Sequence, residues 1–209
     1  GTLQLSDTSC GNHIASPDVH IDEENKRIVM YYHGDTKDGQ KTFVSFSDDG
    51  LNFNSIDKPK GKFYFRVFKY NNQLYSIAKG RNNYGIIYKY LNETWKIIND
   101  RFIKNLRHTG VFVEANNVFI FYSLIGEIQE SIYCSVLDLS NFNLKNTYKI
   151  VKPSLEYEGS NILKKKSIEG IELNYVNQVR DPAIFIYKSE KYLLYSVSGE
   201  KGIALGKLI

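Results

Sequence analysis

The sequence predicts an all-β protein, and three observations support this fold class. The 209 residues include 16 Tyr and 12 Phe but only five Ala and one Met, and aromatic side chains pack well on strands. Short apolar runs recur at a regular interval, and residues typical of turns separate them. The length suits one domain of this class, because β-rich domains often contain roughly 200 to 250 residues.

The strongest apolar runs form an internal repeat. Each run ends in a Gly, and Gly34, Gly80 and Gly126 are separated by 46 residues. The fourth marker, Gly199, comes 27 residues later than this interval predicts. The excess lies in a polar stretch that includes the lysine run 164–166. We therefore interpret residues 152–177 as an insertion between repeats.

Each repeat contains further apolar segments that predict strands on both sides of its marker run. In chain order the predicted strands are 19–21, 28–33, 43–46 and one around Phe53; 65–68, 74–79, 86–88 and 95–98; 111–113, 119–125, 132–136 and 148–150; and 183–186, 192–198 and 203–205. Groups of four strands at a fixed interval are typical of β-propeller blades. The regular spacing favours a propeller over a β-sandwich, which remains the alternative.

The sequence thus predicts a single β-propeller domain over residues 1–209, with about four blades. The predicted blades are residues 13–57, 62–100, 106–150 and 177–209. The last of these has three predicted strands. A strand at residues 2–5 either completes it or ends an upstream blade.

Composition and charge exclude several classes of partner. Lys and Arg number 27 against 23 Asp and Glu, a near balance that predicts no nucleic-acid partner. No apolar run approaches the roughly 18 residues of a membrane-spanning helix, so no membrane partner is predicted. Cys10 and Cys134 are isolated thiols that leave a single disulfide open but suggest no zinc site. No metal or other cofactor is predicted. No signal peptide is visible after Gly1, which decides nothing about the compartment if the chain is a fragment. The compartment is left open with a slight preference for the cytoplasm, and the oligomeric state is also open.

Polar residues stand at the start of the first strand of every predicted blade. Asp18, Arg66, His108 and Asp181 precede their marker Gly by 16, 14, 18 and 18 residues. The first strand of a propeller blade lines the central channel, so we expect these side chains to face one cavity. Local roles compete with this interpretation, because an Asp beside a Pro often caps a turn and a lone His is often structural. His13, just before Asp18, is a further candidate.

Arg66 stands between aromatic residues in an apolar strand. A guanidinium group is costly to bury without a partner. We therefore expect Arg66 to face the channel opposite an Asp.

Convergent carboxylates suggest chemistry on glycosidic bonds, in which one acid protonates the leaving oxygen and a second carboxylate stays ionised. Asp18 and Asp181 are candidates for the base or the transition-state stabiliser. Glu130 follows the marker Gly126 and is the candidate acid. Glu200 has the equivalent place after Gly199, where a solvated turn residue is the competing interpretation.

Several of these motifs resemble a bacterial group related to the five-bladed propeller glycoside hydrolases, which include arabinanases, xylosidases, invertases and levansucrases. Residues 180–182, Arg-Asp-Pro, are similar to an element of the invertase branch in which the Asp stabilises the transition state. Residues 16–18, Ser-Pro-Asp, look like the Ala-Pro-Asp element of the arabinanase branch. The Arg107-His108 pair, residues 126–130 and residues 193–200 also match the group.

The resemblance covers nearly the whole chain and implies five blades. The first blade, which often carries one catalytic carboxylate, would then precede Gly1. The chain departs from the Gly-Asp-x-Pro-Glu-Arg turn of the group, because Glu127, Gln129 and Ser131 stand at the Asp, Pro and Arg positions. Glu130 is retained.

The leading hypothesis is a metal-free glycoside hydrolase that acts on a small glycan or oligosaccharide in the channel. Its candidate catalytic residues are Asp18, Asp181 and Glu130, and its candidate substrate-binding residues are His13, Arg66, Arg107, His108, Arg180 and Glu200. The alternatives are a non-catalytic carbohydrate-binding propeller and a protein-interaction propeller.

Geometry separates these hypotheses. Carboxylates roughly 5–9.5 Å apart in an open pocket would favour hydrolysis. The same carboxylates neutralised by paired arginines would favour binding or a structural role. An aromatic platform from Tyr64, Tyr84 or Trp95 would support sugar binding in either case, although Trp95 is the better candidate for packing between blades.

Overall fold

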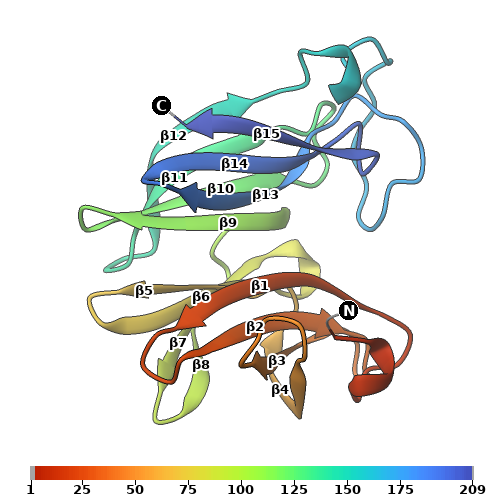
Figure 1. The fold of residues 1–209 in the computed structure, drawn as a ribbon. Helices are drawn as coiled ribbons and strands as arrows, with labels where there is room; N and C mark the ends of the chain where they lie inside the picture. Colours follow the sequence, from red (N-terminus) through yellow and green to blue (C-terminus); the bar gives the residue numbers. More distant parts are fainter. Residues whose placement is uncertain (1–2, 209) are drawn as a thin grey trace.

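The computed structural model describes residues 3–208 and contains four antiparallel sheets in chain order (Figure 1). Sheet one is β1 (Ile14–Asp22), β2 (Arg27–Gly34), β3 (Lys41–Ser47) and β4 (Asn54–Lys62). Sheet two is β5 (Arg66–Tyr70), β6 (Gln73–Lys79), β7 (Gly85–Leu91) and β8 (Thr94–Asn99). Sheet three is β9 (Leu106–Glu114), β10 (Asn117–Leu124), β11 (Ile132–Asp138) and β12 (Asn143–Val151). Sheet four is β13 (Arg180–Tyr187), β14 (Glu190–Val197) and β15 (Gly202–Leu208).

This arrangement confirms the all-β fold class and the four propeller blades. The first strand of each sheet, β1, β5, β9 or β13, lies toward the middle of the molecule (Figure 1). The marker runs form β2, β6, β10 and β14, each of which lies between two neighbouring strands. Strands in this position bury side chains on both faces, which is why their sequences are the most apolar in each repeat.

Hydrophobic clusters join consecutive sheets. Phe65 and Tyr88 of sheet two pack with Tyr31 of sheet one. Ile77 and Ile120 belong to the large cluster between sheets two and three. A third cluster joins sheets three and four through residues Phe121, Ile132, Leu193 and Tyr195. Among residues 3–208, no such cluster joins sheet four back to sheet one.

The predicted strand at residues 2–5 is not found in the part of the chain that the structure describes. Residue 2 lies outside the described residues. Leu3 packs against Tyr32 and Phe43 of sheet one, and Leu5 begins the short 3₁₀ turn η1 (Leu5–Asp7). Sheet four therefore keeps three strands within the described chain.

The chain between β12 and β13 contains a short 3₁₀ turn, η3 (Glu156–Glu158), and otherwise irregular loops. These loops lie at one end of the sheets, at the right of Figure 1. A third 3₁₀ turn, η2 (Arg81–Asn83), follows β6. Within residues 3–208, no helix is long and apolar enough to cross a bilayer.

Candidate functional site at the inner ends of the blades

Three of the four inner strands contain a β-bulge at the same place. In each, two residues lie opposite a single residue of the neighbouring strand: Ser16 and Pro17 in β1, Arg107 and His108 in β9, and Asp181 and Pro182 in β13. Bulges bend a strand and change the direction of its side chains. The site residues therefore leave the regular strand pattern where the blades approach one another.

Asp18 and Asp181 do not occupy equivalent positions in these bulges. Asp181 has the place of Ser16, and both adopt left-handed backbone angles, with φ of 54° and 51°. Asp18 instead follows the bulge. Its Oδ2 accepts a hydrogen bond of 2.7 Å from the backbone N–H of Val67 and lies 2.8 Å from Nε2 of His20. Asp18 thus links β1 to β5.

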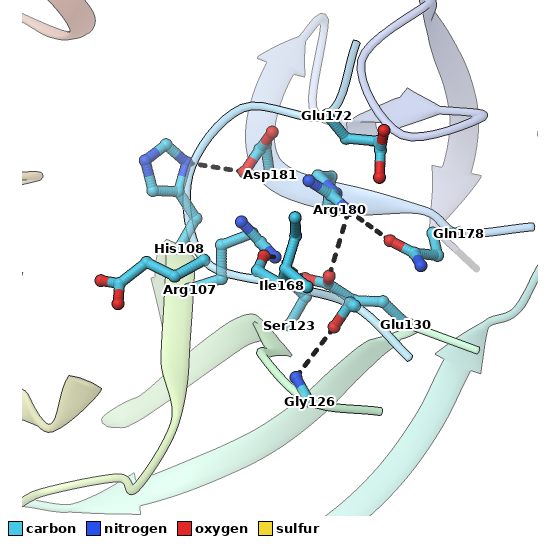
Figure 2. A network of polar contacts seen from close by, with 12 residues as sticks. Arg107, His108, Ser123, Gly126, Glu130, Ile168, Glu172, Gln178, Arg180 and Asp181 are labelled. Carbon is cyan, nitrogen blue, oxygen red and sulfur yellow. Dashed lines mark hydrogen bonds and ion pairs between the residues drawn. The ribbon is translucent and has the colours of Figure 1, made fainter. Parts of the chain in front are cut away.

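His108 and Asp181 form a pair between β9 and β13 (Figure 2), with Nδ1 3.1 Å from Oδ1. Burial would raise the pKa of Asp181, but the adjacent His108, which donates a hydrogen bond to it, and the charges of Arg180 and Arg107 hold the pKa below its ordinary value. Burial also lowers the pKa of His108, despite the opposing effect of Asp181. An ionised carboxylate beside a neutral imidazole requires the proton on Nδ1. Nε2 of His108 is buried, and no other described residue donates to it or accepts from it.

A row of rings extends from this pair. The ring of Tyr64 lies edge-on to His108 with centroids 3.9 Å apart, and its centroid is 4.5 Å from that of His33. His33 lies 5.5 Å from His13, whose Nδ1 is 3.0 Å from Asp35. Burial and the neighbouring His108, His13 and Arg66 lower the pKa of His33 to about 3.

Tyr64 is therefore the aromatic residue that adjoins the His108–Asp181 pair, whereas the other two predicted platform residues lie elsewhere. Trp95 packs between sheets one and two, against Tyr31 and Phe65. Tyr84 forms an isolated bridge with Lys104.

Arg66 lies where sheets one, two and three meet. The prediction that an Asp lies opposite Arg66 is wrong. Its guanidinium group donates to the carbonyls of Thr109 at 3.1 Å, Ser16 at 3.4 Å and Phe65 at 2.9 Å. Within the described chain, no carboxylate forms an ion pair with it. Three backbone carbonyls satisfy this cation in place of an acid.

Glu130 lies in a buried network beside the pair (Figure 2). Its side chain is fully buried, and its oxygens lie 2.6 Å from Nε of Arg107 and 3.4 Å from Nη2 of Arg180. Ser123 Oγ also donates to it at 2.8 Å. A carboxylate enclosed in this way cannot reach a substrate oxygen, so the geometry argues against Glu130 as the catalytic acid.

Arg180 and Glu200 extend the same network. Arg180 is almost completely buried; it donates to Gln178 and lies 3.2 Å from Glu200. Glu200 is partly exposed, and its Oε1 also accepts from the backbone N–H of Glu172. The structure thus brings four predicted site residues together in one cluster, in which Glu200 is the partly exposed member: Arg107, Glu130, Arg180 and Glu200. His13 lies at the far end of the row of rings.

Lys79 was not identified as a candidate site residue in the sequence analysis. It ends the marker run of the second repeat, at the position that His33 occupies in the first. Its side chain is only 5% exposed, and Nζ lies 2.8 Å from Glu169 of the insertion. A charged residue at the end of an apolar run was the available signal. Within residues 3–208, the His, Cys, Asp and Glu side chains form no group of three suited to a metal ion.

A search against protein-family models gives no match for this sequence. The uncharacterized protein R118 of Acanthamoeba polyphaga mimivirus is 30% identical over an alignment 242 positions long. The alignment covers all of this chain and 67% of the viral protein. The chain belongs to the family of mimivirus R118. This relative is viral, whereas the sequence motifs suggested a bacterial group.

Solved structures resemble this R118-family chain in fold. A thermostable family-43 glycoside hydrolase aligns with a TM-score of 0.66 and 15% identity, over 95% of this chain and 70% of that one. An endo-1,4-beta-xylanase from Bacteroides thetaiotaomicron aligns with a TM-score of 0.68 and 15% identity, over 93% and 67%. Since these identities are low, the likeness concerns the fold, which this R118-family chain shares with five-bladed glycoside hydrolases.

Proposed function

We propose that this protein binds a carbohydrate where His108 and Asp181 meet at the inner ends of the blades. One observation carries the proposal: the pair presents an ionised, 25% exposed carboxylate, which the buried imidazole of His108 holds in place. Sugar hydroxyl groups donate hydrogen bonds to carboxylates. The adjoining ring of Tyr64 adds an apolar surface for a sugar ring.

Binding is favoured over a purely structural role because of the contrast with Glu130. The carboxylate of Glu130 is neutralised by two arginines, whereas the described partner of the Asp181 carboxylate is a neutral histidine. The polar groups at the inner strands also disfavour a protein-interaction propeller, for which an apolar surface is expected. The glycoside-hydrolase fold of the neighbours is consistent with a glycan ligand.

Hydrolysis of a glycosidic bond is the second candidate function. The lowered pKa of Asp181 suits a carboxylate that acts as the base or stabilises a positively charged transition state. The reaction also needs an acid. Glu130 is enclosed, and Glu200, the other candidate, is paired with Arg180, which favours its ionised form. Simple binding therefore agrees better with the geometry.

A glycan array followed by titration calorimetry tests the proposal. Asp181→Asn and His108→Gln should each weaken binding of the selected glycan by about tenfold or more, since each removes a hydrogen bond that involves a charged or preorganised group. Asp22→Asn, at the far end of β1, is the matched control and should bind normally. Equal affinity of all three variants and the unchanged protein would contradict the proposed site.

Reducing-sugar release from the same glycan separates the two functions. Binding without release identifies a binding protein. Release that Asp181→Asn abolishes identifies a hydrolase.

A further inference from the structure

Part of the insertion, residues 164–173, lies over buried cations of sheets two and three; we call it the strap. Glu169 of the strap forms an ion pair of 2.8 Å with Lys79 and accepts a hydrogen bond from Asn83 at 3.3 Å. Lys79 is 5% exposed, but the side chain of Glu169 is 59% exposed. The cation is thus part of the folded sheet, whereas its anion belongs to a loop.

Arg107 divides its contacts in the same way. Its Nε binds the fully buried Glu130, which lies in the connection between β10 and β11. Its Nη1 and Nη2 donate to the backbone carbonyls of Gly170 and Ile168 in the strap, at 3.2 and 2.5 Å. One side of the guanidinium group is therefore paired with a buried carboxylate outside the strap. The hydrogen bonds of the other side are accepted by backbone carbonyls of the strap.

The strap supplies these cations with the acceptors that an anionic ligand would supply. Glu169 is the ion-pair partner of Lys79. Arg107 and Arg180 also pair with Glu130, which lies outside the strap. Without the strap, the buried Lys79 loses its ion-pair partner and Arg107 loses two acceptors, and a buried unpaired charge is strongly unfavourable. An anion that enters as the strap leaves would take the place of Glu169.

Little apolar burial holds the strap in place. Its aliphatic side chains Ile168, Ile171 and Leu173 are 60%, 67% and 70% exposed. Ser167 ties it to sheet three through hydrogen bonds with Gly126 and Glu127. Displacement of the strap therefore loses little apolar burial. Its cost lies in the polar contacts with Lys79 and Arg107, which an anionic ligand would replace.

The covered cations adjoin the proposed carbohydrate site. Nζ of Lys79 lies 5.8 Å from the ring centroid of Phe63, and the rings of Phe63 and Tyr64 are 4.8 Å apart. Tyr64 in turn contacts His108. A continuous aromatic surface thus connects the His108–Asp181 pair to Lys79.

We infer that Lys79 and Arg107 form a subsite for the carboxylate of an acidic sugar, and that the strap occupies this subsite until the ligand displaces it. The inference rests on the proposed carbohydrate site and adds the ligand class, a glycan that contains uronic acid. A carboxylate is the favoured anion because the strap itself presents one to Lys79.

Calorimetry with uronate trisaccharides, namely galacturonate, glucuronate and mannuronate, tests the inference on the full chain. At least one should bind, and its methyl ester, which lacks the charge, should bind about tenfold or more weakly. Glu169→Gln should tighten binding of the acid, because it removes the internal competitor and raises the population of the open subsite. Lys79→Met should weaken it. Glu156→Gln, in the same insertion but remote from these cations, is the matched control.

Trypsin cleavage at the lysines 164–166 reports the position of the strap. Addition of the acidic trisaccharide should accelerate cleavage, whereas its methyl ester should not. If no uronate of the panel binds or accelerates cleavage, or if Glu169→Gln and Lys79→Met bind as the control does, the inference is wrong. Equal acceleration by inorganic phosphate would overturn the assignment to an acidic sugar. Loss of neutral-glycan binding in Asp181→Asn is measured separately, so failure of the inference can be distinguished from failure of the proposed function.

Discussion

At the residue scale, the environment of each carboxylate decides what it can do. Glu130 and Asp181 lie in the same region, yet one is enclosed by Arg107 and Arg180 and the other lies beside His108 with a partly exposed side chain. Two acidic residues in neighbouring settings often have different roles for this reason. We therefore propose a structural role for Glu130 and a ligand-binding role for Asp181.

Replacement of Glu130 tests its structural role. Glu130→Gln leaves Arg107 and Arg180 buried beside an uncharged amide, which should lower the free energy of unfolding by about 3–5 kcal/mol. Urea denaturation at neutral pH measures this loss. Glu190→Gln, whose carboxylate pairs with the exposed Lys207, should change stability little. A fully stable Glu130→Gln protein would show that the arginines do not depend on this carboxylate.

The lowered pKa of His33 predicts a specific dependence of stability on pH. The unfolded chain protonates this imidazole near its ordinary pKa, whereas the folded protein resists protonation down to about 3. The unfolded state therefore binds more protons between these values, and stability falls as the pH decreases through this window. The contribution is of order 1 kcal/mol per pH unit.

His33→Phe keeps a ring against Tyr64 and removes the titrating group. The difference in unfolding free energy between pH 7 and pH 4 should be smaller in this variant than in the unchanged protein. Identical pH dependence would rule out His33 as a source of the acid sensitivity.

The sequence located several residues of the site but not their partners. Offsets from the marker Gly residues correctly indicated that His108 and Asp181 lie at the inner ends of the blades. The prediction groups Asp18 with Asp181 although their offsets are 16 and 18, whereas Ser16 has the offset of 18 and holds the equivalent position. A bulge adds one residue on one strand and redirects the side chains, and short sequence motifs do not specify this change.

At the element scale, the inner strands approach closely where Gly110 of β9 faces the bulge of β13. A Cβ atom at Gly110 would lie 2.9 Å from the carbonyl oxygen of Pro182 and 3.3 Å from its carbonyl carbon. Backbone atoms cannot move aside as a flexible side chain can. The absence of a side chain here allows β9 and β13 to meet.

Gly110→Ala should therefore destabilise the protein by about 1–3 kcal/mol, as expected for overpacking. Gly206→Ala in β15 is the matched control, because no atom lies within 4 Å of a Cβ there. Thermal unfolding of both variants measures the difference. Equal midpoints would show that the two strands separate without cost.

The sequence predicted the central strands better than the outer ones. Each marker run overlaps one observed strand, β2, β6, β10 or β14. The apolar residues of these strands are covered on both faces. The outer strand β4 exposes most of its side chains, so it lacks an apolar run. Phe53, around which this strand was predicted, lies just before β4. The strap contacts were not predictable, because irregular loops carry no periodic signal.

At the scale of the whole molecule, the four sheets form a row that is held by the clusters between consecutive sheets. The cluster between sheets two and three contains the completely buried Ile77, Ile87 and Ile120. At the sheet-four end of the row, apolar side chains are exposed to solvent: Ile203 and Leu205 of β15 are 76% and 60% exposed. Stability should therefore be unevenly distributed along the row.

Hydrogen exchange measures this distribution. The amides of β6, β7 and β10 should exchange slowest, because local opening there requires loss of the largest cluster. The amides of β15, an edge strand with an exposed apolar face, should exchange faster. Uniform protection across the four sheets would contradict this prediction.

A crystal structure of the protein with the tightest glycan from the array tests the central claim most directly. We predict that the sugar lies against Tyr64, with a hydroxyl group bonded to the carboxylate of Asp181. A glycan bound elsewhere, with the His108–Asp181 pair free of ligand, would contradict the account.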